Sequence, residues 1–135
     1  ALALKLSEDL NAGHMIGIMA DRTFGSEHTV TCQLVDGDVE LPIGVWQLAS
    51  TLGVPVLSCF GIYQGGNHYS VHVEKVASDF TFRRKERLAK IAEYAQVYAS
   101  QMNRFILLNP FNWFNFYSYW KKGPSGENSN ASTTR

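Results

Sequence analysis

The chain has 135 residues and a formal net charge of +0 at pH 7; 45% of its residues are hydrophobic and 18% are charged. This balance is typical of one folded domain, and it excludes a disordered chain or one that attracts nucleic acid through net positive charge. No apolar run approaches the roughly 20 residues that a membrane-spanning helix needs. We therefore expect membrane contact only at the surface, or through a span outside this chain.

The first elements are predicted from hydrophobic periodicity and turn residues. Residues 1–11 follow a helical pattern that stops at Gly13, and we expect the chain to begin inside a domain. The apolar run 14–20 is expected to be a buried strand that leads into a polar loop at 21–28. Residues 29–35 alternate apolar and polar side chains, which predicts a half-buried strand.

A second group of elements is predicted in the middle of the chain. It comprises a tight turn at 36–38, a helix at 41–53, a buried strand at 54–64, a turn at 65–67 and a strand at 68–76. Pro42 suits the first turn of that helix, and Gly53 suits its end. The last strand is expected to cover Tyr69, Val71 and Val73 while its polar side chains face solvent.

The longest helical pattern covers residues 83–103. The order of helices and strands predicts an α/β fold with a mixed β-sheet flanked by helices. Residues 1–122 show no break in composition and are assigned to one domain. Residues 123–135 have no apolar anchor and are expected to form a flexible tail.

Residues 109–122, with the sequence NPFNWFNFYSYWKK, form a dense aromatic cluster. As a helix, this segment would place on one face Trp113, Phe116, Tyr117 and Trp120. As a strand, it would be aromatic on both faces and would suit only a buried position. Aromatic rings followed by Lys121 and Lys122 are typical of an element at the membrane–water interface. Packing of the rings onto the domain core is the structural alternative.

Asp21 and Arg22 directly follow the first predicted strand, where α/β folds commonly place ligand-binding loops. In that role Asp21 would orient a catalytic base or bind a substrate group, and Arg22 would hold a phosphate or a carboxylate. The structural alternative is a turn that closes on Gly25, with an ion pair between Asp21 and Arg22.

The histidines and cysteines predict no metal site. His68 and His72 are four residues apart on one strand, roughly 13 Å along its axis, which is too far to share a metal. His28, in the polar loop, is kept as a weak site candidate. Cys32 and Cys59 lie in apolar strand-like runs and are expected to be buried reduced thiols. No nucleophile-elbow or phosphate-loop motif is present, and no cofactor is expected.

The run RRKER at 83–87 is a basic patch at the start of the long helix. Such a patch is ordinarily a solvated face, and the functional alternative is contact with anionic lipid or with the acidic surface of a carrier protein. The predicted membrane or partner contact therefore comprises Arg83, Arg84, Lys85, Trp113, Trp120, Lys121 and Lys122.

Three blocks resemble a known family: GIMADRTFG, then LPIGVWQLASTLGVPVLSCFGIYQGGNHYSVHVEKV, then NPFNWFNFYSYW. Their order and spacing, over about residues 1–121, are similar to those of the lipid A biosynthesis acyltransferases. That family is the bacterial branch of the lysophospholipid acyltransferase superfamily. The first block carries the family's strand-end aspartate and glycine at Asp21 and Gly25. The second carries its Pro-x-Gly-x-x-x-Leu-Ala helix start, beginning here at Pro42.

The resemblance implies an enzyme that moves a fatty acyl chain from an acyl carrier protein or coenzyme A thioester to a lipid or glycolipid hydroxyl. It also implies a peripheral position on the cytoplasmic face of the bacterial inner membrane. Enzymes of this family use a His-x-x-x-x-Asp/Glu motif, in which the imidazole removes the acceptor proton and the carboxylate fixes the tautomer. The resemblance carries over Asp21 as a substrate-binding residue, together with Arg22 and Gly25.

The histidine motif is absent, because the positions five residues after the four histidines hold Met19, Gln33, Val73 and Ala77. We therefore expect a C-terminal fragment that is inactive alone, with its catalytic histidine on a missing N-terminal part. The end of the chain also lacks the arginine-rich ending of the best-known members, which suggests a different acceptor. The alternative is a noncatalytic α/β module that binds a membrane or a carrier protein.

Overall fold

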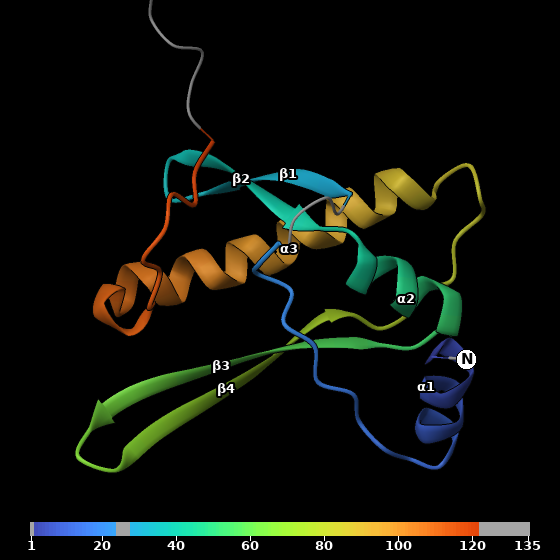
Figure 1. Cartoon of the computed structure of the whole chain (residues 1–135), viewed down its shortest axis with the longest axis horizontal. Coiled ribbons are helices and arrows are strands. Elements are labelled where there is room, and N and C mark those ends of the chain that lie inside the picture. Colours follow the sequence, from blue (N-terminus) through green and yellow to red (C-terminus); the bar gives the residue numbers. More distant parts are fainter. Residues whose placement is uncertain (1, 24–27, 122–135) are drawn as a thin grey trace, which may run out of the picture.

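The computed structural model describes residues 2–23 and 28–121 of the chain. Its elements follow in the order α1 (Leu2–Asn11), β1 (Thr29–Leu34), β2 (Gly37–Pro42), α2 (Gly44–Leu52), β3 (Val56–Gly65), β4 (His68–Ala77), α3 (Arg87–Leu108) and the 3-10 helix η1 (Pro110–Asn112). The four strands form two separate antiparallel hairpins, β1–β2 and β3–β4, and Figure 1 shows α3 passing between them. The predicted α/β class is confirmed, and the strands of this part of the chain lie in two small sheets.

The β1–β2 hairpin is well covered on its inner face. Val35 and Asp36 form its turn with φ values of 48° and 59°, the left-handed conformation that tight hairpin turns require. The inward side chains alternate along both strands and are at most 1% exposed: Cys32, Leu34, Val39 and Leu41. The half-buried strand predicted at 29–35 is thereby confirmed.

Helix α2 begins later than predicted. The sequence predicts a helix over 41–53, but Pro42 ends β2 and the helix starts at Gly44. Pro42 lies opposite Thr29 and has no N–H with which to continue the ladder, so strand pairing stops there. Gly53, with a φ of 63°, ends α2 as predicted.

Helix α3 is the centre of the hydrophobic core. Buried side chains recur along it at helical spacing: Ile91, Ala95, Ala99, Met102 and Ile106. They belong to one cluster with the inner face of β1–β2 and with Trp46 and Phe80, whose rings stack 6.2 Å apart. The helix predicted over 83–103 is confirmed, although it begins at Arg87 and continues to Leu108.

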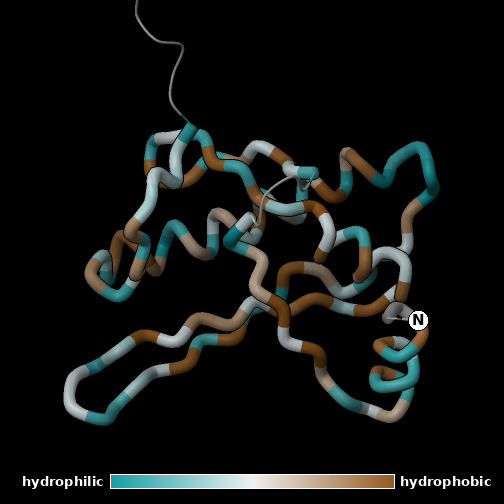
Figure 2. The backbone as a smooth tube through the Cα atoms, in the orientation of Figure 1, coloured by the Kyte–Doolittle hydropathy of each residue, from teal (hydrophilic) through white to brown (hydrophobic). Residues whose placement is uncertain are grey.

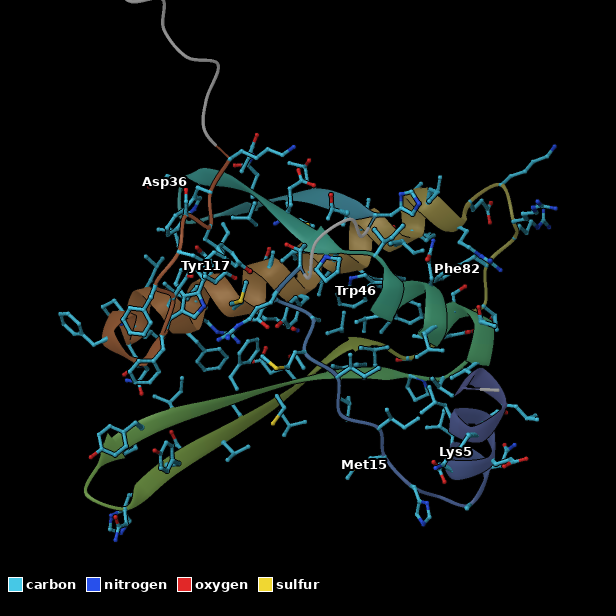
Figure 3. All side chains as sticks on the ribbon, in the orientation of Figure 1. Lys5, Met15, Asp36, Trp46, Phe82 and Tyr117 are labelled. Atoms are coloured by element: carbon cyan, nitrogen blue, oxygen red, sulfur yellow. The ribbon has the colours of Figure 1, made fainter. Side chains whose placement is uncertain are left out.

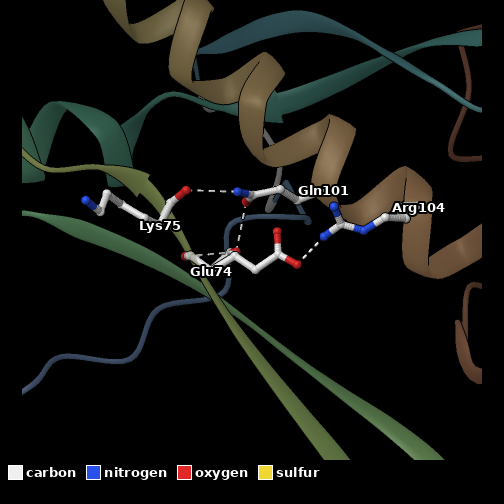
Figure 4. A network of polar contacts seen from close by, with 5 residues as sticks. Glu74, Lys75, Gln101 and Arg104 are labelled. Atoms are coloured by element: carbon white, nitrogen blue, oxygen red, sulfur yellow. Dashed lines mark hydrogen bonds and ion pairs between the residues drawn. The ribbon is translucent and has the colours of Figure 1, made fainter.

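Strand β4 turns its polar face toward α3. Figure 4 shows Gln101 and Arg104 of α3 reaching Lys75 and Glu74 of β4. Three side chains that the sequence predicts to be covered are exposed instead: Tyr69, Val71 and Val73. This prediction was wrong because α3 offers polar side chains on this side, so the polar face of the strand lies against the helix.

Strand β3 is not the fully buried strand predicted over 54–64. Its burial alternates, and only Ser58 and Ile62 are fully covered, because one face of β3 lies against α3 while the other points outward. Both cysteines are free thiols. The prediction of a buried thiol is right for Cys32 and wrong for Cys59, which lies on the outward face.

Residues 14–20, predicted to be a buried strand, form an irregular and mostly exposed segment. Met15 is 91% exposed, Ile18 49% and Met19 56%. No strand within residues 2–23 and 28–121 pairs with this segment, so its backbone joins no sheet there. The preceding helix α1 and its stop at Gly13, with a φ of 85°, are as predicted.

The aromatic segment after α3 is mostly irregular. After the single turn of η1 it continues without helix to Lys121, so the helical interpretation of its pattern is wrong. The backbone N–H of Lys121 donates a 2.8 Å hydrogen bond to the carbonyl of Asp38. The indole N–H of Trp120 donates a 2.8 Å bond to the carbonyl of Leu34. These long-range bonds hold the end of the segment against the β1–β2 hairpin.

Two further predictions concern a membrane-spanning helix and the boundary between the domain and its tail. Within 2–23 and 28–121, no helix is both long and apolar enough to cross a membrane. The division into a domain of 1–122 and a tail of 123–135 stays a prediction, since the tail lies outside those ranges.

Candidate functional site

A large pocket lies where the irregular segment 14–21 faces α2, β3 and α3. Its volume is about 1010 Å³, at the upper end of the range of roughly 300–1,000 Å³ for small-molecule sites. Figure 2 shows mainly hydrophobic residues along the chain where these segments meet. The pocket is therefore suited to an apolar ligand of considerable size.

The pocket walls are apolar because each element turns hydrophobic side chains toward the same space. They include Leu48 and Leu52 of α2, Phe60 and Ile62 of β3, and Met102 and Ile106 of α3. Trp46 and Trp113 also line the pocket, and they come from positions 67 residues apart in the sequence. The apolar runs that the sequence identifies as separate elements thus meet around one cavity.

Asp21 brings a carboxylate to this mainly apolar pocket. The side chain of Asp21 is 19% exposed, and its Oδ2 lies 3.5 Å from Nε of Arg22, whose side chain is 42% exposed. The ion pair expected under the structural alternative is therefore present. The substrate-binding roles of both residues stay predictions.

Three tyrosines surround Asp21, and the sequence does not identify them as site residues. Burial and then the charge of Asp21 raise the pKa of Tyr98 and of Tyr119 far above the ordinary value for tyrosine. Burial also raises the pKa of Tyr117, although the charge of Arg22 acts against it. The hydroxyl of Tyr119 donates a hydrogen bond to the backbone carbonyl of Asp21. These phenols therefore remain neutral near pH 7.

No hydrogen bond joins a histidine to Asp21 within residues 2–23 and 28–121. His14 lines the same large pocket as Asp21, and its Nδ1 lies 3.8 Å from Oδ1 of Asp9. His72 contacts Ser70 and the ring of Phe105. His28 borders a smaller pocket of about 360 Å³ that also includes Arg22. Across the same residues, no group of three or more His, Cys, Asp or Glu side chains is arranged to hold a metal ion.

The residues predicted to contact a membrane or partner are divided between two regions. Arg83, Arg84 and Lys85 are exposed just before α3. The aromatic segment follows the other end of α3, whose 22 residues span about 33 Å at about 1.5 Å per residue. These two groups therefore form no single surface.

The aromatic and lysine members of the predicted surface are partly turned inward. Trp113 is half-buried, lines the pocket and packs edge-on against Trp120 with a centroid distance of 5.7 Å. Lys121 forms an ion pair with Glu40 and donates a 2.8 Å hydrogen bond to Thr31. Their predicted contact with a membrane or partner is untested, as are the roles of Gly25 and Lys122, which lie outside the described residues.

Comparison with known sequences identifies the family. The sequence model of the bacterial lipid A biosynthesis acyltransferases matches residues 4–122. This chain belongs to that family. The match spans the acyltransferase-like region that the three sequence blocks indicate, and it includes the pocket, Asp21 and the aromatic segment. No match is found among curated proteins or among solved structures.

Proposed function

We propose that this acyltransferase-family chain forms the acyl-binding part of an enzyme that transfers a fatty acyl group to a lipid or glycolipid hydroxyl. The donor is a thioester of an acyl carrier protein or of coenzyme A. The observation that carries this proposal is the pocket of about 1010 Å³, with apolar walls and a carboxylate at Asp21. A fatty acyl chain needs an apolar cavity for its methylenes and polar groups only near its thioester.

The polar groups around Asp21 fit the reacting end of such a substrate. Arg22 presents a partly exposed guanidinium beside Asp21, suited to a phosphate or carboxylate of the donor or acceptor. Tyr119 holds the backbone at Asp21 through its hydroxyl. Asp21 and Arg22 would thus position the substrates, while the apolar walls would bind the hydrocarbon part of the fatty acyl group and select its length.

Acyl transfer to a hydroxyl also needs a base to remove the hydroxyl proton. None of the four histidines is followed five positions later by an acidic residue. No hydrogen bond joins a histidine to Asp21 within the described ranges. We infer that the base comes from outside these 135 residues, so the chain acts as the C-terminal part of a site and is inactive alone. The enzyme would work as a peripheral protein on the cytoplasmic face of the bacterial inner membrane.

Filling the pocket tests the acyl-binding role directly. A side chain added at Gly61 enters free space, and this glycine lines the pocket. Gly61→Phe should weaken binding of dodecanoyl-coenzyme A by at least about tenfold, because the new ring takes the place of part of the acyl chain. A tenfold rise in Kd corresponds to a loss of only ~1.4 kcal/mol of apolar contact. Tryptophan fluorescence measures the binding.

The control is Leu88→Phe, which introduces the same side chain elsewhere. Leu88 is 68% exposed and lines neither the large pocket nor the smaller one. This variant should bind dodecanoyl-coenzyme A like the unchanged chain. Equal affinities of all three proteins, or no binding by any of them, would contradict the acyl-binding role.

The transfer assay tests the location of the base. The 135-residue chain, given acyl thioester and a hydroxyl acceptor, should show no turnover above the buffer blank. Turnover by the 135-residue chain that disappears in Asp21→Ala would refute the inference that this chain holds only part of the catalytic site. In a polypeptide that also carries the histidine motif, Asp21→Ala should lose most of kcat/KM, and an unchanged value would remove Asp21 from the site.

The second candidate is a noncatalytic module that docks on a membrane or a carrier protein. It is favoured by Arg83, Arg84 and Lys85, which are exposed and form no ion pair within the described part of the chain. A module of this kind needs no acyl pocket. Tight thioester binding that Gly61→Phe removes would therefore decide for the acyltransferase role.

A further inference from the structure

The backbone that carries Asp21 is held in place by few contacts. Residues 15–22, which we call the Asp21 segment, pair with no described strand, and Ala20 is their only member in the core cluster of the described residues. Within residues 2–23 and 28–121, one hydrogen bond connects this segment to another element: the hydroxyl of Tyr119 donates to the carbonyl of Asp21. The position of the Asp21 carboxylate in the pocket therefore depends on where Tyr119 is held.

Tyr119 belongs to residues 113–121, which lead from η1 to the β1–β2 hairpin and which we call the strap. Figure 3 shows the chain passing from Tyr117 toward the hairpin turn at Asp36. Burial and then the charge of Asp21 raise the pKa of Tyr119, so its hydroxyl keeps its proton and remains a hydrogen-bond donor. The strap thus presents a permanent donor to the Asp21 segment.

The strap is fastened to the hairpin beside Gly37. The indole N–H of Trp120 donates its 2.8 Å bond to the carbonyl of Leu34, and Trp120 forms an isolated β-bridge with Val39. A Cβ added at Gly37 would lie 3.0 Å from Nε1 and 3.2 Å from Cγ of Trp120, and closer still to Cδ1. Because the φ of Gly37 lies outside the left-handed region, glycine is needed here for the indole ring and not for the backbone.

We propose that Gly37 and Trp120 are positioning residues for Asp21, acting through Tyr119. Gly37 leaves room for the indole, and the indole fixes the strap on the hairpin. The fixed strap then holds the hydroxyl of Tyr119 against the carbonyl of Asp21. Gly37 and Trp120 themselves line neither pocket, so they act on the site only through these contacts. The consequence for acyl transfer rests on the proposed function, whereas the positioning itself does not.

Nuclear magnetic resonance of the 135-residue chain tests the positioning without any substrate. In Gly37→Ala the Trp120 indole N–H signal should shift, the carbonyl carbon signal of Asp21 should move upfield, and the amide order parameters of the Asp21 segment should fall below about 0.6. The matched control is Gly61→Ala, which adds the same methyl group to a strand where nothing lies within 4 Å of the added Cβ. The control should keep all three observables of the unchanged chain.

Two further variants test the individual links. Tyr119→Phe removes only a hydroxyl and keeps the ring, so it remains informative even where Gly37→Ala does not fold. It should move the Asp21 carbonyl signal and loosen the Asp21 segment while the Trp120 indole signal stays in place. Trp120→Ala should loosen the segment as Gly37→Ala does, and Gly37→Ala should then add nothing to it, because the added methyl group acts only on the missing ring.

Three results would overturn the proposal. The first is an Asp21 carbonyl signal that stays in place in Tyr119→Phe. The second is a Gly37→Ala chain in which the Trp120 signal moves while the Asp21 segment keeps its order. The third is a further loss of order when Gly37→Ala is added to Trp120→Ala.

Kinetics then separate positioning from acyl binding. In a polypeptide that also carries the histidine motif, Tyr119→Phe should lower kcat on the order of tenfold, while the KM for dodecanoyl-coenzyme A changes by less than about twofold. A raised KM with an unchanged kcat would make Tyr119 a binding residue and overturn its positioning role. If the unchanged chain binds no dodecanoyl-coenzyme A, the proposed function fails, and the resonance signals still decide whether the strap positions Asp21.

Discussion

The two hairpins are both antiparallel and both lie against α3, yet they are covered differently. In β1–β2 the inward side chains Cys32, Leu34, Val39 and Leu41 are at most 1% exposed. In β3–β4 only β3 turns large apolar side chains toward α3, whereas Tyr69 and Val71 of β4 face outward and are 67% and 63% exposed. Alternation along a strand therefore establishes that its two faces differ, but it does not establish which face is covered.

The side chains of α3 explain the difference. Toward β1, Gln96 and Asn103 bond the strand edge, since their side-chain oxygens accept 2.8 Å bonds from the backbone N–H groups of Gln33 and Val35. The polar groups thus close the edge and leave the apolar faces in contact. Toward β3–β4, Gln101 accepts a 2.8 Å bond from the hydroxyl of Ser58 on the strand face itself. Beside it, Gln101 also donates to the carbonyl of Lys75 and Arg104 pairs with Glu74, so the polar face of β4 lies against the helix.

Thiol labelling should show the largest contrast between the hairpins. Cys32 is 1% exposed, and burial, followed by the charge of Glu40, raises its pKa to about 11. Cys59 lies on the outward face of β3. A disulfide reagent at pH 8 should modify Cys59 on the order of 1,000-fold faster than Cys32, because Cys32 must wait for opening of the core and is rarely ionised.

The measurement uses single-thiol chains. Cys59→Ser leaves only Cys32, and Cys32→Ala leaves only Cys59. Similar labelling rates for these two chains would contradict the assignment of covered and open hairpin faces.

Shortening one leucine side chain to alanine in each hairpin should give the next largest difference, in the free energy of unfolding. Leu41 is fully buried, so Leu41→Ala should lower the free energy of unfolding by about 2–5 kcal/mol through lost contact and the cavity left behind. Leu57 is 55% exposed, so Leu57→Ala should change it by less than about 0.5 kcal/mol. Urea denaturation at pH 7 compares the two variants, and equal losses would show that the β3–β4 face is covered in solution.

The smallest effect concerns the carboxylate on the outer face of β1–β2. Partial burial alone would raise the pKa of Glu40, but bonds from Lys121, Thr29 and Thr31 and the charge of Lys121 together hold it below its ordinary 4.5. Because the folded-state pKa is depressed, this carboxylate contributes stability above pH 4.5, and the contribution is lost as the pH falls through the depressed value. Glu40→Gln should therefore lower the free energy of unfolding by about 0.5–1 kcal/mol at pH 7.

The pH dependence provides the check. The stability difference between the unchanged chain and Glu40→Gln should shrink as the pH falls below 4.5. Lys121→Gln should reproduce most of the loss at pH 7, and the double variant should add little to it. A difference that stays constant or grows toward acid would contradict the depressed pKa.

Much of the local structure follows from the sequence alone. Helix α1, the end of α2 at Gly53, the β3–β4 hairpin and the long helix α3 are all predicted, because glycine positions and hydrophobic periods act over a few residues. Strand β2 is not predicted, and the turn expected at 36–38 lies at Val35 and Asp36. The family is also evident from three ordered blocks, and the match over residues 4–122 confirms it. The aspartate that lines the pocket is among the predicted site residues.

Other features were decided by tertiary structure, because they depend on contacts between distant positions. Residues 14–20 have the pattern of a buried strand, but a strand forms only where another strand pairs with it. Tyr119 reaches Asp21 across 98 positions and Trp120 reaches Leu34 across 86, so no local pattern could predict the tyrosines of the site or the inward turn of the tryptophans. The sequence determined which side chains form apolar and polar faces, and α3 decided which of those faces became core, pocket and open surface.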